Sequence, residues 1–180
     1  MIYPIIRPNL DILFVGLNPA KTSSEKGHYF SVKPSFWEQL YGAGLIKSPV
    51  DMNNADEKVF KSSEINYNGW QYGVTDLVNF LAESKSSKVP VTEEDCKELL
   101  RNIRKYKPKV VILLHSKVIK YFVKKHLNKD ARRGCLGNLV DGCNTIFYYA
   151  PFPHGNSIPS TEKIELYKEI KEFLLENSNC

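Results

Sequence analysis

Four short runs rich in apolar residues, separated by segments of helical spacing, restrict the fold of this chain more than any other feature. The runs are residues 11–15, 72–78, 110–114 and 145–149. The first and third are apolar at nearly every position, as is typical of strands buried on both faces of a parallel sheet. Crossovers through the intervening helices predict an α/β fold, with three layers, α/β/α, and a central, mainly parallel four-stranded sheet. We expect residues 1–180 to form a single domain.

Helix signals occupy the gaps between these runs. Ser35 is a candidate N-cap for the first helix, and Gly44 is a candidate stop. Thr92-Glu93-Glu94-Asp95 is similar to a capping box and opens the second helix, which runs up to Pro108. Helices are expected over 35–45, 92–107, 116–126 and 160–176, with a short one near 55–61 and a turn-rich basic segment around 132–134.

Composition and charge narrow the class of protein. The chain has 42% hydrophobic and 25% charged residues, which is typical of a soluble globular protein. No apolar run approaches the roughly 20 residues that a bilayer span needs. The N-terminus lacks the pattern of a signal peptide, so we expect a cytoplasmic protein that is not secreted, associated with the nucleoid if bacterial. The net charge of +5 suits a polyanionic partner but is weak evidence for one.

Cysteine spacing gives no sign of a metal site. The four cysteines, Cys96, Cys135, Cys143 and Cys180, contain no C-x-x-C pair. Disulfides rarely persist in a reducing compartment. We therefore expect ordinary thiols and no bound metal.

The loops after the first and fourth strands are expected to carry the chemistry, because ligands of parallel sheets bind beyond the carboxyl ends of the strands. The first loop reads Gly16-Leu17-Asn18-Pro19-Ala20 and continues through Gly27-His28-Tyr29-Phe30 to Pro34-Ser35-Phe36-Trp37 and Ala43-Gly44. This order resembles the mismatch-specific uracil-DNA glycosylases and the thymine-DNA glycosylases. In them Gly-Ile-Asn-Pro-Gly precedes a Gly, a stacking Phe, a Phe-Trp pair and an Ala-Gly. The run 73–78, Gly-Val-Thr-Asp-Leu-Val, likewise resembles their Gly-Ile-Thr-x-Leu-Val.

The resemblance implies a DNA glycosylase of the uracil-DNA glycosylase superfamily. Asn18 would position the attacking water through its side-chain carbonyl, because an amide is not a true general base. Phe30 would stack on a base rotated out of the helix, with Leu17, Pro19 and Tyr29 completing the base pocket. Taken alone, Asn18-Pro19 could be a turn and Phe30 a core aromatic, whereas the ordered set of motifs favours the functional interpretation.

The second loop, residues 151–157, aligns with the family's Pro-Asn-Pro-Ser-Gly-Leu-Ser but departs from it. Phe152 stands where this branch has Asn and the classical uracil enzymes have the catalytic His, and it can contact a base but cannot donate a hydrogen bond. His154 is a candidate catalytic donor, or else a surface or phosphate-contacting histidine. Asn156 replaces the Leu that fills the vacated stack and could hydrogen-bond the orphaned partner base. Gly155 keeps the loop slim, and Ser157 could hold a phosphate.

Four further residues are expected to contact the DNA backbone. Lys85 and Lys88 lie in the loop after the second strand, and Ser116 and Lys117 open the helix after the third. Such contacts fix the position of a protein on DNA without reading the sequence. For any single lysine the alternative is a solvated surface, which we expect for Lys120, Lys124 and Lys125.

The leading hypothesis is a monofunctional DNA glycosylase of base excision repair, monomeric, without metal or organic cofactor. It would hydrolyse the N-glycosidic bond of uracil, or of another deaminated or mispaired base, in double-stranded DNA. No lysine in either loop stands at an obvious nucleophile position, which predicts no strand cleavage. The alternative is a catalytically silent module that binds DNA lesions or nucleotides, motivated by Phe152. A third hypothesis, an enzyme of small nucleotides, is disfavoured because the chain has no P-loop or G-x-G-x-x-G.

Overall fold

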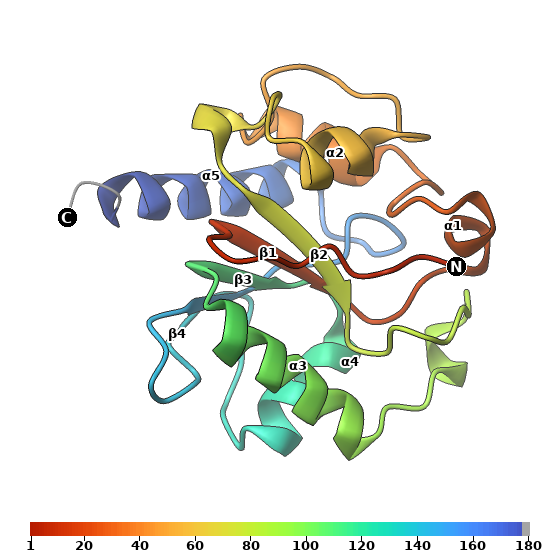
Figure 1. Ribbon diagram of the computed structural model, residues 1–180, viewed down its shortest axis with the longest axis vertical. Coiled ribbons are helices and arrows are strands. Elements are labelled where there is room, and N and C mark those ends of the chain that lie inside the picture. The colour runs from red at the N-terminus through yellow and green to blue at the C-terminus, as the bar shows by residue number, and fades with distance from the viewer. Residues whose placement is uncertain (178–180) are drawn as a thin grey trace.

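Five strands form one sheet through the middle of the molecule (Figure 1). The computed structural model describes residues 1–177. The strands are β1 (Ile12–Gly16), β2 (Tyr72–Asp76), β3 (Val110–Leu113), β4 (Gly134–Gly137) and β5 (Ile146–Tyr149). Their order is β2-β1-β3-β5-β4, and the first four run parallel. The mainly parallel α/β architecture is thus as expected from the sequence.

The expected count of four strands was wrong, because β4 adds an antiparallel edge strand beside β5. Its sequence, Gly-Cys-Leu-Gly, contains two glycines and is only partly buried. It therefore carries neither the apolar run nor the alternation that marks a strand. The pairing is also irregular between Cys135 and Gly137. The turn-rich basic segment predicted around 132–134 overlaps the start of this strand at Gly134.

Helices cover both faces of the sheet. In Figure 1, α2 (Ser35–Gly42) and α5 (Ser160–Asn177) lie on one side of it, and α3 (Glu93–Tyr106) and α4 (Ser116–Val118) on the other. The α4 helix continues directly into the π-helical segment η4 (Ile119–His126), so that the two form the expected helix over 116–126. The remaining short elements are α1 (Lys21–Lys26), η1 (Glu57–Lys61), η2 (Tyr67–Gly69) and η3 (Ser86–Lys88).

The helix ends follow the expected signals with one exception. Thr92 caps α3, since its hydroxyl accepts from the Asp95 amide at 3.2 Å while the Asp95 carboxylate accepts from the Thr92 amide at 2.7 Å. Gly44, just beyond α2, has a positive φ of 68°. The N-cap of α2 is Pro34, not Ser35, which is already the first helical residue. Proline fixes φ near the helical value and suits this position.

Alternate residues of β1 project into two apolar cores, one on each face of the sheet. Ile12 and Phe14 pack beneath α2 and α5, whereas Leu13 and Val15 pack against α3 and η4. All four are fully buried. This burial on both faces explains why the run is continuously apolar, as a central parallel strand requires.

The structure describes three of the four cysteines. Cys96 and Cys143 are buried free thiols and Cys135 is an exposed one, while Cys180 lies outside the described residues. Within residues 1–177, none of the helices combines the length and apolar character of a membrane span.

Candidate active site

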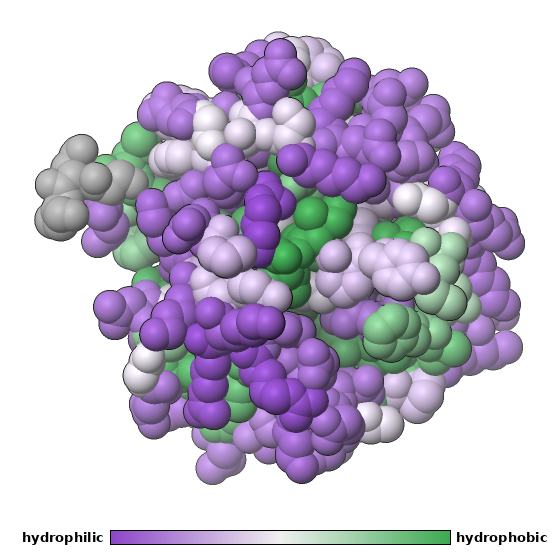
Figure 2. Space-filling view, in the orientation of Figure 1, coloured by the Kyte–Doolittle hydropathy of each residue, from purple (hydrophilic) through white to green (hydrophobic). Residues whose placement is uncertain are grey.

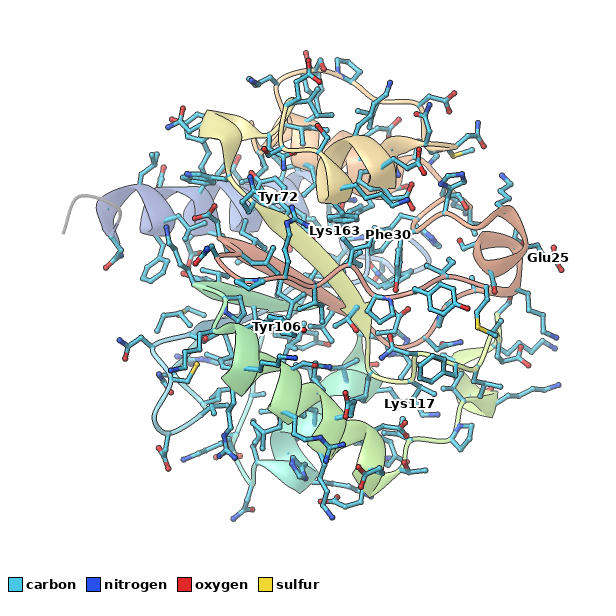
Figure 3. The ribbon with its side chains drawn as sticks, viewed as in Figure 1. Glu25, Phe30, Tyr72, Tyr106, Lys117 and Lys163 are labelled. Atoms are coloured by element: carbon cyan, nitrogen blue, oxygen red, sulfur yellow. The ribbon has the colours of Figure 1, made fainter. Side chains whose placement is uncertain are left out.

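A cleft of about 630 Å³ opens at the carboxyl ends of the parallel strands. The loops after β1, β2, β3 and β5 line it. Figure 3 labels Phe30 and Lys117, which lie at this end of the sheet. Ten of the predicted site residues line the cleft: Leu17, Asn18, Pro19, Tyr29, Phe30, Ser116, Phe152, His154, Gly155 and Asn156. The other four, Lys85, Lys88, Lys117 and Ser157, are not among its lining residues.

Asn18 is held in one orientation by its own loop and by the loop after β2. Its Nδ2 donates to the carbonyl oxygens of Pro19, Leu81 and Glu83 at 2.9, 3.0 and 2.8 Å. Three carbonyls can be satisfied only by the amide nitrogen, so the assignment of Nδ2 and Oδ1 follows from the network. Oδ1 accepts no hydrogen bond from residues 1–177 and is left to accept one from a bound molecule.

Phe30 forms an aromatic wall of the cleft. Its ring stacks on Phe36 with centroids 3.9 Å apart, and its carbonyl accepts from Trp37 Nε1 at 3.1 Å. Phe30 itself has a positive φ of 51°, a strained conformation for a bulky residue that the surrounding contacts must impose. The ring is half-buried, with Phe36 on one face. The Phe-Trp pair seen in the sequence therefore fixes both the ring and the backbone of Phe30.

A buried aspartate, which the sequence did not single out, holds the Phe30 loop in place. Asp56 accepts from the Tyr29 amide at 2.9 Å, and its other oxygen lies 2.9 Å from His28 Nδ1. The same oxygen accepts from the Glu57 amide at 2.9 Å. Asp56 lies in the polar connection 46–69, where no motif marks it, because its partner is 27 residues away in sequence.

The second loop brings Phe152 and His154 to the cleft together with His115, which follows β3. The ring of Phe152 lies 6.0 Å from that of His115 and 5.0 Å from that of His154. Two side chains fix this loop through the Pro153 carbonyl, which accepts from Gln39 Nε2 at 3.0 Å and from Lys163 Nζ at 3.1 Å. An aromatic cluster thus borders the cleft opposite the Asn18 loop.

Both cleft histidines favour the neutral form. Burial, together with Lys117, lowers the pKa of His115, and burial, together with Lys33 and Lys163, lowers the pKa of His154. Nδ1 of His115 accepts from the Lys117 amide at 3.0 Å, so its single proton must sit on Nε2. His115 is therefore a neutral N–H donor at the cleft, a role that its sequence context did not reveal.

Asn156 lies at the exposed tip of the second loop, where its side chain hydrogen-bonds to other residues of the same loop. Its Nδ2 donates to the carbonyls of Phe152 and His154 at 2.8 and 3.3 Å, and its Oδ1 accepts from the Ile158 amide at 3.2 Å. Gly155 has a positive φ of 76°, which suits the turn. The polar side chain of Asn156 therefore stabilises the tip. To contact a partner base, it would have to replace these hydrogen bonds by bonds to the base.

The cations near the cleft differ from those expected. Lys33 and Arg133 line it, although the sequence gave no reason to choose them. Nζ of Lys117 instead donates to the carbonyls of Ser86 and Val89 at 2.8 and 2.6 Å and ties the loop after β2 to α4. Lys85 and Lys88 are exposed on the same loop.

Asp76, at the end of β2, is a buried carboxyl that lines the cleft. It is 6% exposed, and its Oδ2 is buried without a hydrogen-bond partner. Burial raises the pKa of this carboxyl to about 7. Tyr29, which also lines the cleft, has a buried hydroxyl without a partner, and burial followed by Asp76 and Asp56 raises its pKa. In residues 1–177 no group of three His, Cys, Asp or Glu side chains is arranged to hold a metal ion.

A comparison with protein families places almost the whole chain in one of them. Residues 3–173 match the model described as the Uracil DNA glycosylase superfamily. The matched range contains all five strands and every residue that lines the cleft except Ile2.

Proposed function

This chain belongs to the uracil-DNA glycosylase superfamily, and we propose that it excises uracil, or another deaminated or mispaired base, from double-stranded DNA. The superfamily points to DNA glycosylase activity and to DNA as the partner. Within it, the motifs around Asn18 and Phe30 favour the mismatch-specific branch. The reaction is hydrolysis of the bond between C1′ of the sugar and the base.

The observation that carries this proposal is the fixed orientation of Asn18 beside an aromatic wall. With Nδ2 engaged by three carbonyls, Oδ1 is the group that faces the cleft as an acceptor. A water that donates to Oδ1 has a lone pair directed at C1′ of a nucleotide whose base lies against Phe30. Positioning of this kind lowers the barrier without proton abstraction by the amide.

The bond that breaks is the N-glycosidic bond, and its electron pair leaves with the base. The water oxygen forms the new bond to C1′ and releases a proton to solvent, and the base anion takes up a proton in turn. A donor near the base oxygen stabilises the charge that develops on the departing base. Neutral His154 and His115 supply N–H groups at this side of the cleft, which offsets the absence of a donor at Phe152.

Base flipping and DNA binding use the rim of the cleft. Phe30 offers a stacking surface for the extruded base. Lys33 and Arg133 stand at the rim as phosphate contacts, and the exposed tip Gly155–Ser157 approaches the groove. Lys85 and Lys88 extend the same basic surface along the neighbouring loop.

The alternative is a module that binds lesions without excising the base. Phe152 motivates it, because its ring fills the position of a donor and packs between two histidine rings. The two functions differ in one product, the abasic site, so a single assay separates them.

The test is a set of duplex oligonucleotides carrying G·U, G·T, A·U and hypoxanthine·T pairs, incubated with the wild type and with Asn18→Ala. We expect abasic sites that alkali converts to strand breaks, no breaks before alkali, and at least a 100-fold slower reaction with Asn18→Ala, as a rough estimate for loss of water positioning. Duplex binding should be retained by the variant. Tight binding without product on any pair would favour the lesion-binding alternative.

A further inference from the structure

Phe80 is the most exposed of the large hydrophobic side chains in residues 1–177, at 76%. It belongs to the loop after β2, and it lies in sequence between Asp76 and Glu83, which both line the cleft. Phe80 itself is not among the lining residues. Its ring therefore lies outside the pocket, in solvent, next to chain segments that form the wall of the cleft.

The turn that carries Phe80 is closed by the preceding side chain. Oδ1 of Asn79 accepts from the Asp76 amide at 3.1 Å and from the Thr75 hydroxyl at 3.2 Å. Asn79 thereby ties the turn back to the end of β2. Since the backbone beneath the exposed ring is already ordered, contact of this ring with a partner costs little further backbone entropy.

Phe80 also has a fixed place relative to Asn18. Three backbone hydrogen bonds of 2.8–3.1 Å join residues 77–83 to residues 16–19. In addition, the carbonyl of Leu81, the residue after Phe80, accepts from Asn18 Nδ2 at 3.0 Å. The exposed ring and the residue proposed to position water thus belong to two loops that are held together.

The surroundings of Phe80 indicate the chemistry of its partner. Lys85 and Lys88 are exposed on the same loop, whereas the carboxylate of Glu83 pairs with Lys21 at 3.8 Å. Exposed cations beside an apolar ring suit a partner that carries phosphates outside and stacked aromatic faces inside. A nucleic acid duplex combines both features.

Extrusion of a base leaves a gap in the duplex, and an apolar side chain inserted between base steps offsets the lost stacking. The side chain of Asn156, at the tip of the second loop, is polar and hydrogen-bonds within that loop. Phe80 presents an apolar ring on the opposite loop, outside the pocket that takes the extruded base.

We propose that Phe80 enters the base stack of a bound duplex beside the extruded nucleotide and fills part of the gap from the loop after β2. The proposal rests on the function proposed above and adds a DNA contact outside the cleft. It distinguishes this loop from the basic rim, because a phenyl ring stabilises the complex without displacing counterions from phosphates.

Binding and stacking can be measured together without cleavage. The probe is a duplex with 2′-fluoro-2′-deoxyuridine opposite G, which resists hydrolysis, and with 2-aminopurine as the neighbouring base in the same strand. We expect Phe80→Ala to bind about tenfold more weakly, because one contact between an aromatic ring and a base is lost. The dependence of its affinity on salt should remain that of the wild type.

The fluorescence of 2-aminopurine reports insertion directly, because this base emits more strongly when it is unstacked. At saturating protein the wild type should raise the emission, and Phe80→Ala should lose most of that rise. Phe80→Trp should restore both the affinity and the rise, since indole offers a larger stacking face. Since Phe80 is exposed, all of these variants should melt at the wild-type temperature.

Tyr41→Ala is the matched control, because it removes another exposed aromatic ring, from α2, that does not line the cleft. It should bind and fluoresce as the wild type does. A wild-type rise in Phe80→Ala, no rise in Phe80→Trp, or equal losses in Tyr41→Ala would overturn the proposal.

Release of uracil from an ordinary G·U duplex separates this proposal from the glycosylase function. If the wild type released uracil but Phe80→Ala kept the full fluorescence rise, the function would stand and the insertion would be rejected. If the rise depended on Phe80 but no uracil was released, the insertion would stand and the protein would bind lesions without excising them. A wild type that bound no duplex would reject both.

Discussion

Asn18 illustrates how backbone groups fix the orientation of a single side chain in this cleft. A free asparagine can present either end of its amide, and only the end that faces the substrate matters for positioning water. Here the carbonyls of Pro19, Leu81 and Glu83 accept hydrogen bonds from the amide nitrogen. The orientation of this side chain is therefore decided by backbone groups of two loops, one of them more than 60 residues away.

Asn18→Asp should lower the rate of base release, although a carboxylate is the stronger base. The substituted oxygen cannot donate to the three carbonyls, which would then face a negative charge in a partly buried site. We expect a loss of at least tenfold in the single-turnover rate and a loss of about 1–3 kcal/mol in the free energy of unfolding. Rates and melting curves for Asn18→Asp and Asn18→Ala measure both effects. A faster reaction with Asn18→Asp would show that Oδ1 is not limited to positioning.

Asp76 should make the stability of the protein depend on pH. Its folded-state pKa of about 7 lies above the ordinary value of 3.8. Between these values the native state binds more protons than the unfolded state, so the stability of the wild type falls as the pH rises, and the loss is complete above about pH 7. Asp76→Asn lacks this loss. The free energy of unfolding of Asp76→Asn, relative to that of the wild type, should therefore increase by roughly 2–3 kcal/mol between pH 5 and pH 8.5. Denaturant unfolding of both proteins measures it, and a constant difference would contradict the assignment.

Side chains from other parts of the sequence hold two of the cleft loops in place. The Phe30 loop is fixed by Asp56 and Trp37, and the loop after β2 is fixed by Lys117. Before Phe30 the loop after β1 contains only the short α1 helix, and the loop after β2 contains only the three-residue η3, so these loops have little regular structure of their own. Side chains of neighbouring elements therefore make these loops rigid.

Asp56→Ala should slow base release, although Asp56 itself is not proposed to contact the substrate. The change removes the acceptor of the Tyr29 and Glu57 amides and the partner of His28. We expect a loss of about 1–3 kcal/mol in stability and at least a tenfold slower single-turnover reaction, as order-of-magnitude estimates. Asp51→Ala is the control, because Asp51 is exposed and its side chain bonds only to Asn53. Equal rates for Asp56→Ala and the wild type would mean that the clamp is dispensable.

The sequence predicted the elements better than it predicted the site. The four parallel strands and the Thr92 cap follow from local patterns of burial and capping, and the structure has them. The β4 strand has no such pattern. Asp56, Asp76 and His115 could not be recognised as site residues because their roles depend on neighbours that only the fold supplies. His115, for example, becomes a donor through a cap on α4 and lies against Phe152 of another loop.

At the scale of the whole molecule, charge and shape favour a polyanion at the cleft. The net charge is +5, and Lys33 and Arg133 stand at the rim of the cleft without an ion pair in the described part of the chain. Figure 2 shows a largely hydrophilic face with a hydrophobic strip near its centre. In the proposed function, long-range attraction would bring DNA to the protein, and these two cations would set its position.

The salt dependence of binding tests whether these two cations touch phosphates. The double variant Lys33→Ala/Arg133→Ala should weaken duplex binding. The slope of the logarithm of the association constant against the logarithm of the salt concentration should become shallower by about two, because each phosphate contact contributes roughly one. Lys120→Ala/Lys124→Ala removes the same charge from exposed positions outside the cleft. If both double variants lowered the slope equally, net charge and not the rim would determine binding.

Release of a free base tests the central claim most directly. A G·U duplex is incubated with the wild type or with Asn18→Ala, and the small molecules are identified by mass spectrometry alongside the abasic strand. The glycosylase function predicts free uracil and abasic strand in equal amounts from the wild type, with both nearly absent for Asn18→Ala. If the wild type bound the G·U, G·T, A·U and hypoxanthine·T duplexes but released no free base from any of them, the glycosylase function would be wrong.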